Sequence, residues 1–422
     1  MDRLKEIALD LDSKDKLSKY REQFTLPNNK IYLDGNSLGI LAKDIINDIN
    51  YTIEEEWGNN LISSWNQSWI KLPELISKKI ASIIRCNMEE VYVGSSTSIN
   101  LYKLMKSIIK ANKKIKNIST DNINFPSDKY ICESIANDFK IDFNFIDYGN
   151  ELIPDFEKLK KYILEKGGLI VLSHVSYKSS FRYPILEISK FCKDNNTIII
   201  WDLSHSVGAI DIDMRSNEVD YAVGCTYKYL NGGPGSPAFI YVKKCELKKL
   251  EAPIKGWFSH NKPFEYSSEY IASNSIDKFS NGTPHILSLS TLKTSLDITL
   301  EATTEKLSDK SANLFDFFVS IYNNKLKKLD FKLLSPLDKN KRGSHISISH
   351  KEAWRISKCL IVPINNKATS IIVDFRPQNI IRIALTPLYT SFEDIQIISE
   401  RIIQIINERE YEQKDNSMRG VT

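Results

Sequence analysis

Short apolar segments alternate with helix-periodic segments from about residue 90 to residue 240. The clearest apolar run is T-I-I-I-W at 197–201, which is rich in β-branched residues, as a buried strand is. Other short runs, separated by segments of helical periodicity, occupy residues 91–93, 117–120, 168–172, 220–224 and 237–242. This alternation predicts an α/β fold with a largely parallel sheet that helices cover on both faces.

The two ends of the chain show other patterns. Apolar spacing predicts helices over 1–24 and 43–58, and one long helix from 289 to about 324. Beyond it, a strand, a helix and two further strands are expected at 342–350, 351–360, 370–375 and around 380–384. We therefore expect an N-terminal segment packed with the small domain (1–50), a large domain (51–290) and a small C-terminal α/β domain (291–422) whose charged tail after residue 408 is frayed.

Composition narrows the class of protein. The 422 residues include 57 Lys and Arg against 53 Asp and Glu, and a net charge of +4 does not suit a dedicated nucleic-acid binder. No apolar run reaches membrane-spanning length. The six cysteines are scattered without a C-x-x-C pair, which argues against zinc or a disulfide framework. We expect a cytoplasmic protein without a metal centre, nucleic-acid partner or membrane contact.

Two chemically distinctive side chains follow neighbouring strands. Asp202 ends the 197–201 run, and Lys228 follows the 220–224 run, 228 − 202 = 26 residues later. Ligands of open α/β sheets bind at the carboxyl ends of strands. A lysine that forms a Schiff base and a carboxylate that pairs with a pyridine nitrogen are what pyridoxal 5'-phosphate (PLP) requires. The alternative is a helix-capping Asp202 and a solvated Lys228.

Further candidate residues stand at strand ends and helix starts. Thr97 and Ser98 lie where a turn enters a helix, so they suit a phosphate or an ordinary cap. Phe125 precedes a proline at a strand end and is either core or a platform for a flat ring. Ser173 stands at a third strand end. Arg382, flanked by apolar residues in a strand, suits a substrate carboxylate or a structural salt bridge.

The amino-acid sequences of six motifs strongly favour the PLP-binding interpretation. In chain order they are I-Y-L-D-G-N-S-L-G, E-W-G-N-N-L-I-S-S-W-N, N-F-P-S-D, W-D-L-S-H-S-V-G, T-Y-K-Y-L-N-G-G-P-G-S-P-A-F and R-I-A-L-T-P-L-Y. Together they resemble kynureninases of the bacterial type, over roughly residues 20–400. The resemblance implies the PLP-dependent fold type I (aspartate-aminotransferase-like, class V), a seven-stranded-type sheet, and a homodimer with its active site at the subunit interface.

The resemblance also implies a reaction and its residues. The reaction is hydrolysis of L-kynurenine, and possibly 3-hydroxy-L-kynurenine, to anthranilate (or 3-hydroxyanthranilate) and L-alanine, in tryptophan catabolism or the NAD-related kynurenine pathway. Lys228 would hold PLP and move the Cα proton, and Tyr227 would assist proton delivery to the alanyl fragment. Arg382 would bind the substrate carboxylate, with Asn36 and Trp65 as further substrate contacts. The cofactor contacts would be Thr97, Ser98, Phe125, Asp128, Ser173, Asp202, His205, Tyr227, Lys228, Trp257 and Thr283.

Two residues depart from the family pattern. Ser259 replaces a family glycine in G-W-F-S-H, which could alter the geometry of that loop. His285 stands where a proline is usual, and we expect it to be an exposed loop residue without a catalytic role.

Three competing functions stay open at this stage. A cysteine desulfurase or selenocysteine lyase would need a mobile nucleophilic cysteine, for which Cys359 in an apolar segment is the one C-terminal candidate. An aminotransferase could use the same cofactor-binding residues, and only product analysis excludes it. A catalytically silent PLP-binding protein would show the cofactor's absorption without turnover.

Overall fold

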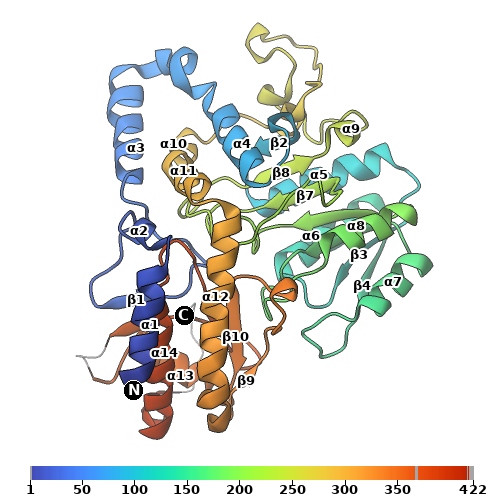
Figure 1. Ribbon diagram of the computed structural model, residues 1–422. Coiled ribbons are helices and arrows are strands. Elements are labelled where there is room, and N and C mark those ends of the chain that lie inside the picture. Colours follow the sequence, from blue (N-terminus) through green and yellow to red (C-terminus); the bar gives the residue numbers. More distant parts are fainter. Residues whose placement is uncertain (1, 366–368, 416, 418–422) are drawn as a thin grey trace.

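The computed structural model describes residues 2–365, 369–415 and 417. Its centre is a seven-stranded sheet in the order β2-β8-β7-β6-β5-β3-β4 (Figure 1). Neighbouring strands are parallel except where β8 pairs with β2 and β7, which confirms the mostly parallel sheet. The strands are β2 (Val91–Val93), β3 (Asn117–Asp121), β4 (Asp142–Ile146), β5 (Leu169–Ser173), β6 (Ile198–Asp202), β7 (Tyr221–Gly224) and β8 (Phe239–Val242).

Helices cover both faces of this sheet because its central strands are apolar on both sides. In β5, Leu169 and Val171 belong to one hydrophobic cluster, whereas Ile170 and Leu172 belong to another. Successive side chains of a strand point to opposite faces, so each cluster marks one covered face. The first cluster includes α5 (Thr97–Ala111) and α6 (Pro126–Phe139); the second includes α4 (Leu72–Ile83), α7 (Phe156–Glu165), α8 (Ile185–Asp194) and α11 (Leu292–Ala302).

The C-terminal part has its own sheet and its own core. Four antiparallel strands lie in the order β12-β13-β10-β9 and pack with three helices. The strands are β9 (Lys332–Leu333), β10 (His345–Ser349), β12 (Asp374–Arg376) and β13 (Ile380–Ala384). The helices are α12 (Thr304–Asn324), α13 (Ala353–Ile361) and α14 (Phe392–Asn407).

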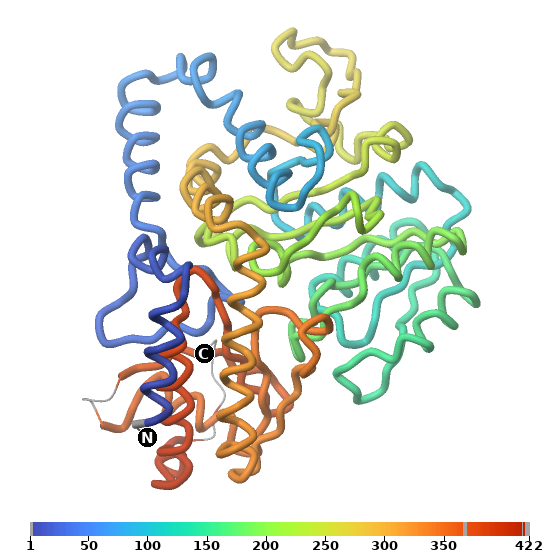
Figure 2. The backbone as a smooth tube through the Cα atoms, in the orientation of Figure 1, coloured from blue at the N-terminus to red at the C-terminus, as the bar shows by residue number. Residues whose placement is uncertain are grey.

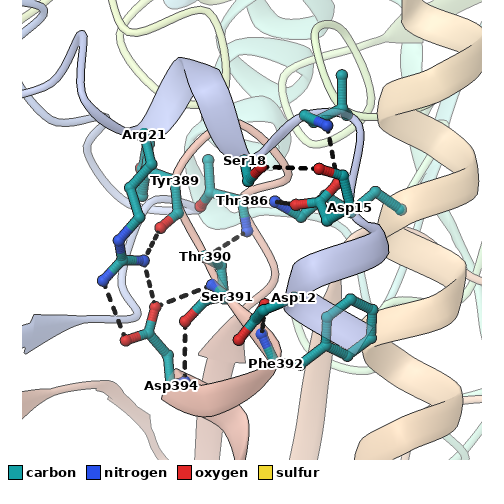
Figure 3. Close-up of polar contacts among 12 residues, drawn as sticks. Asp12, Asp15, Ser18, Arg21, Thr386, Tyr389, Thr390, Ser391, Phe392 and Asp394 are labelled. Atoms are coloured by element: carbon teal, nitrogen blue, oxygen red, sulfur yellow. Dashed lines mark hydrogen bonds and ion pairs between the residues drawn. The ribbon is translucent and has the colours of Figure 1, made fainter. Parts of the chain in front are cut away.

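The N-terminal segment packs against this C-terminal part. Helix α1 (Asp2–Lys14) runs beside α14, and the blue and red ends of the chain lie together in Figure 2. Strand β1 (Lys30–Tyr32) pairs in parallel with β11 (Ser370–Ile372). Figure 3 shows the polar junction, where the Asp12 carboxylate accepts a hydrogen bond from the backbone N–H of Phe392 (2.8 Å). The same carboxylate accepts a second hydrogen bond from the backbone N–H of Glu393 (2.9 Å). Asp12 thereby adds a negative charge at the positive end of α14, whose N-cap residue is Ser391.

Two expected elements are divided. The long helix expected from 289 to 324 is three helices, α10 (Ile286–Ser290), α11 and α12. The break between α11 and α12 lies at Thr303, which adopts φ 65°, outside the helical region. The strand expected over 370–375 is β11 and β12, which belong to different sheets. Both expectations were based on the spacing of apolar residues, and this spacing does not predict a change of backbone direction at one residue.

Two further expectations need correction. The helix expected over 43–58 is α3 (Ile45–Tyr51) followed by π-helical turns over Thr52–Asn59, with another π-helical segment at Trp65–Trp69. The tail is not frayed directly after residue 408, because buried Glu410 pairs with Arg401 through two contacts of 2.5 and 2.7 Å. The remaining short helices are α2 (Ser18–Arg21) and α9 (Lys244–Leu247). Within the described ranges, no helix has the length and apolarity needed to cross a membrane.

Candidate active site

The carboxyl ends of β5, β6 and β7 meet at one edge of the large sheet. Asp202 lies opposite Ser173 on one side and Val223 on the other, and β7 leads directly into the Lys228 loop. A cavity of about 740 Å³ opens here. Eight of the residues predicted from the sequence line it: Thr97, Ser98, Phe125, Asp128, Asp202, His205, Tyr227 and Lys228.

The Lys228 amine is held by a neutral histidine. Its Nζ lies 2.9 Å from Nε2 of His205 and 5.8 Å from the centre of the Phe125 ring. Burial, followed by the positive charge of Lys228, holds the pKa of His205 well below its usual value. If the Lys228 amine donates to Nε2, the neutral imidazole carries its proton on Nδ1. This buried Nδ1 has no hydrogen-bond partner in the described structure.

Two carboxyl groups lie on the same cavity in different surroundings. Asp202 Oδ1 accepts hydrogen bonds from the backbone N–H of Ser204 (2.9 Å) and from its hydroxyl (2.6 Å). Burial and the negative charge of Asp202 raise the pKa of Asp128 well above its usual value. Asp128 Oδ2 is buried without a hydrogen-bond partner among the described residues. A wall with two acidic groups and an unsatisfied oxygen fits a ligand that carries a positively charged N–H.

A turn and a helix start form another part of the cavity wall. Ser95 adopts φ 57° between β2 and α5, and Ser96 caps α5 by accepting from the N–H of Ile99 at 3.4 Å. The first-turn N–H groups of a helix lack intrahelical partners and favour an anion. The hydroxyls of Thr97 and Ser98 stand in that first turn and line the cavity. The residues present therefore fit a ligand with a phosphate at one end and a protonated ring nitrogen at the other.

The motif at residues 31–39 packs on the lysine loop. Gly39 N–H donates to the Tyr227 carbonyl at 2.7 Å, and a Cβ at Gly39 would stand 2.3 Å from the Lys228 carbonyl oxygen. Glycine is therefore the residue that permits this approach. The same motif supplies Asn36 and Ser37 to the surroundings of Arg382.

Arg382 is buried and already has partners. Its Nε pairs with Asp374, its Nη1 donates to the Tyr177 carbonyl at 2.8 Å, and its Nη2 donates to the Ser37 hydroxyl at 3.2 Å. With its side-chain amide flipped, Asn36 accepts from both Nη atoms at 3.2 Å. The side chain is 1% exposed and does not line the 740 Å³ cavity. The salt-bridge alternative is thus present, and carboxylate binding stays a prediction.

Four other predicted residues lie away from the lining of this cavity. Ser173 donates its hydroxyl to Asn124 Oδ1 at 2.6 Å. Trp257 is 39% exposed and packs on Phe258, and Trp65 packs on the same Phe258 ring at 5.8 Å. Thr283 is exposed and lines an adjoining cavity of about 610 Å³. Their contacts with cofactor or substrate stay predictions.

The two departures from the family pattern have separate settings. Ser259 is buried, and its hydroxyl accepts from the Gly256 N–H at 2.9 Å and contacts the Tyr270 hydroxyl at 2.9 Å. The serine hydroxyl therefore stabilises the loop in which it lies through hydrogen bonds within that loop. His285 is exposed, as expected, and also lies at the rim shared by the two cavities.

Several residues at the site were not predicted from the sequence. Asp374 faces Arg382 across the β12–β13 pair, and the eight-residue spacing around a short turn was the available signal. His345 brings its ring to 5.7 Å from His205. Ser95 and Asn281 line the cavity, although 186 residues separate them in the chain. No local pattern indicates a contact over that separation.

Cys359 is fully buried in the core of the C-terminal part, packed among the side chains of α13 and its neighbours. Burial raises the pKa of its thiol. A buried, protonated thiol lacks the exposure and the thiolate character that a nucleophilic cysteine requires. This setting disfavours the desulfurase function.

Comparison with known proteins agrees with this geometry. A model of the kynureninase C-terminal domain matches residues 307–402. The chain is 34% identical to the kynureninase of Pseudomonas fluorescens, over 98% of each chain. It is also 34% identical to the kynureninase of Burkholderia pseudomallei, over 96% of this chain and 95% of the relative.

Solved structures show the same fold at low sequence identity. A cysteine desulfurase from Thermococcus onnurineus superposes with a TM-score of 0.79 at 17% identity, covering 93% of this chain and 98% of that one. A C-DES mutant with glycine covalently linked to its PLP cofactor gives a TM-score of 0.77, also at 17% identity, covering 91% of this chain and 98% of that one. These likenesses confirm the predicted fold class, a large sheet domain joined to a smaller C-terminal domain.

Proposed function

The chain belongs to the kynureninase family, and we propose that it hydrolyses the Cβ–Cγ bond of L-kynurenine with PLP, releasing anthranilate and L-alanine in tryptophan catabolism. The observation that carries the proposal is the joint presence of Lys228, Asp202 and the α5 helix start around one cavity. Bound PLP supplies an electron sink for the bonds at the substrate Cα and Cβ.

The chain's own residues supply binding and proton transfer. The Lys228 amine, which lies 2.9 Å from Nε2 of His205, would attach the cofactor and later move the Cα proton. Asp202 would pair with the protonated ring nitrogen of a bound cofactor, and Asp128, which lines the same cavity, would support that wall. Burial raises the pKa of Tyr227, so its phenol stays protonated. We assign to this phenol the proton that the alanyl fragment receives.

The substrate carboxylate binds the Nη edge of Arg382. The acceptors now on that edge, Ser37, Asn36 and the Tyr177 carbonyl, are all neutral, whereas the charged Asp374 occupies Nε. A carboxylate accepts stronger hydrogen bonds from guanidinium than neutral groups do, and it takes two in parallel. It therefore displaces the neutral acceptors while the ion pair with Asp374 remains and orients the fork.

We also propose a cytoplasmic homodimer whose partner subunit completes the site. The segment between α3 and α4 exposes large apolar side chains, with Trp57 57%, Leu61 60% and Ile62 77% exposed. Exposed apolar side chains that cluster on one segment suit burial against another protein surface. Trp65 belongs to the same segment, and Thr283 lies on a nearby loop, so both would face the partner. Sedimentation equilibrium of the purified enzyme tests this assembly, and a monomer at micromolar concentration would contradict it.

The reaction is tested by incubating purified protein with PLP and L-kynurenine and by measuring anthranilate and alanine. Equal amounts of both products are expected. A parallel incubation with 3-hydroxy-L-kynurenine sets the substrate preference. An amino-acid-dependent change in the cofactor spectrum without anthranilate would point to transamination or to a silent relative and would reject the proposed reaction.

A further inference from the structure

A lysine lies buried behind the turn that leads into α5. Lys103 stands on α5 and is 0% exposed. Its Nζ donates to the Phe279 carbonyl at 2.7 Å and to the Ser95 hydroxyl at 3.2 Å, and it lies 4.6 Å from the centre of the Tyr92 ring. The side chain thus joins the turn after β2 to the loop at residues 279–281.

This ammonium group has no carboxylate partner among the described residues. None of the ion pairs found there includes Lys103, and its three neighbours are a carbonyl, a hydroxyl and an aromatic ring. Burial lowers the pKa of Lys103 to about 7, and no acidic group in the described ranges opposes that shift. A buried, unpaired lysine is costly, so Lys103 suits a position behind a wall that binds a negatively charged group.

The geometry shows where that negative charge would enter. Ser95 and Asn281 both line the main cavity, next to Thr97 and Ser98, and Asn281 donates to the same Ser95 hydroxyl at 3.2 Å. Asn281 Oδ1 is buried without a hydrogen-bond partner within the described ranges. One hydroxyl therefore links Lys103 and the 279–281 loop to the wall that faces the proposed cofactor phosphate.

We propose that Lys103 is a positioning residue for the cofactor phosphate, which it serves through Ser95 from behind the turn without touching the ligand. This inference rests on the PLP site of the proposed function and goes beyond it. Entry of a phosphate dianion stabilises the ammonium form, so binding takes up a proton from solvent wherever Lys103 is neutral in the free protein. Cofactor binding would thereby stabilise the contact between the turn at Ser95 and the loop at residues 279–281.

The sign of the pH dependence follows directly. Below about pH 7, Lys103 is already charged and the phosphate binds without proton uptake. Above that pH, the free protein must first gain a proton, so the affinity that Lys103 contributes falls as the pH rises. A group that only filled space would show no such dependence.

The experiment measures binding to the apoenzyme in the absence of kynurenine, so its outcome is independent of the proposed reaction. Dissociation constants are determined for PLP and for pyridoxal, which lacks the phosphate, with wild type, Lys103→Met, and the control Lys110→Met at the exposed end of the same helix. We expect Lys103→Met to weaken PLP binding at least about tenfold at pH 7, given a charge pair a few ångströms apart. Pyridoxal binding should change less than about twofold, and the control should match wild type.

The pH series decides between positioning and packing. The ratio of the Lys103→Met constant to the wild-type constant for PLP should shrink as the pH rises from 7 to 9. Should the variant not fold, calorimetry of wild type in two buffers at pH 8 gives the same information, because PLP should take up more protons than pyridoxal does. Equal losses for PLP and pyridoxal, a ratio independent of pH, or equal proton uptake for both ligands would each overturn the inference.

Discussion

The two halves of the site differ in how their polar groups are satisfied. On the cofactor side, Asp128 Oδ2 and His205 Nδ1 are buried without partners among the described residues, and they belong to a wall that lines an open cavity. On the substrate side, Arg382 is 1% exposed, and Asp374, Ser37, Asn36 and a backbone carbonyl already occupy its donors. The cofactor half leaves hydrogen-bonding capacity for a ligand, whereas the protein already fills the donors of Arg382.

This difference suits a resident ligand on one side and a transient one on the other. A group that stays bound can satisfy buried atoms permanently, so the chain need not supply their partners. A substrate that comes and goes would leave a bare guanidinium buried after each turnover, which is costly. The neutral groups around Arg382 cover it between turnovers and yield to a carboxylate. Each of the following changes tests one side of this contrast.

Lys228→Ala should have the largest effect. Removing the amine deletes both cofactor attachment and Cα proton transfer, so turnover should fall on the order of 10³-fold or more. The assay is steady-state formation of anthranilate, with circular dichroism to confirm the fold and exposed Lys248→Ala as the control. Activity near the wild-type level would remove Lys228 from the mechanism.

Arg382→Lys should come second and should act on the substrate side alone. A lysine keeps the charge but loses the planar fork, so KM for kynurenine should rise roughly 10- to 100-fold. The dissociation constant of PLP should stay within about twofold of wild type, because Arg382 does not line the cofactor cavity. An unchanged KM would mean that Arg382 serves only its ion pair with Asp374.

Asp128→Asn should act on the stability of the apoenzyme. A carboxyl whose pKa is raised by folding contributes stability below its unfolded pKa of about 4 and loses it as the pH rises through the folded pKa. The amide does not ionise, so the variant should melt at a higher temperature than wild type at pH 8, by roughly 2–4 °C, and the gap should narrow at pH 5. Scanning calorimetry of both apoproteins at the two pH values measures this. A gap that widens on acidification would show that Asp128 is not held protonated.

Asp12→Ala should have the smallest effect on the site. Losing these two hydrogen bonds at the start of α14 should cost about 1 kcal/mol in urea unfolding, while the N-cap residue Ser391 stays in place. The contact lies at the junction that supports the Arg382 sheet, so KM should rise by less than about threefold while PLP affinity is unchanged. The matched variant is Asp10→Ala, on the exposed face of the same helix. Loss of PLP affinity in Asp12→Ala would mean that the two halves are not independent.

The sequence determined the fold class and most of the cofactor side. Asp202 ends a strand, Thr97 and Phe125 stand at helix starts, and Lys228 lies in the loop that follows a strand. The carboxyl ends of parallel strands meet at one edge of a sheet. Strand ends and helix starts can be predicted from nearby residues, because short apolar runs and turn residues mark them. The amino-acid sequences of the motifs then distinguished one family of PLP enzymes from related families.

The tertiary structure alone decided what surrounds those residues. The partners of Arg382 and the link from Lys103 through Ser95 to the 279–281 loop arise between segments far apart in the chain. The break at Thr303 arises from a single backbone angle, and the division of 370–375 arises because β11 and β12 join different sheets. Hydrophobic periodicity reports which face of an element is buried, not which side chain lies against it. Those contacts depend on how whole domains pack, and for that reason the charge balance of the site became visible only in the folded chain.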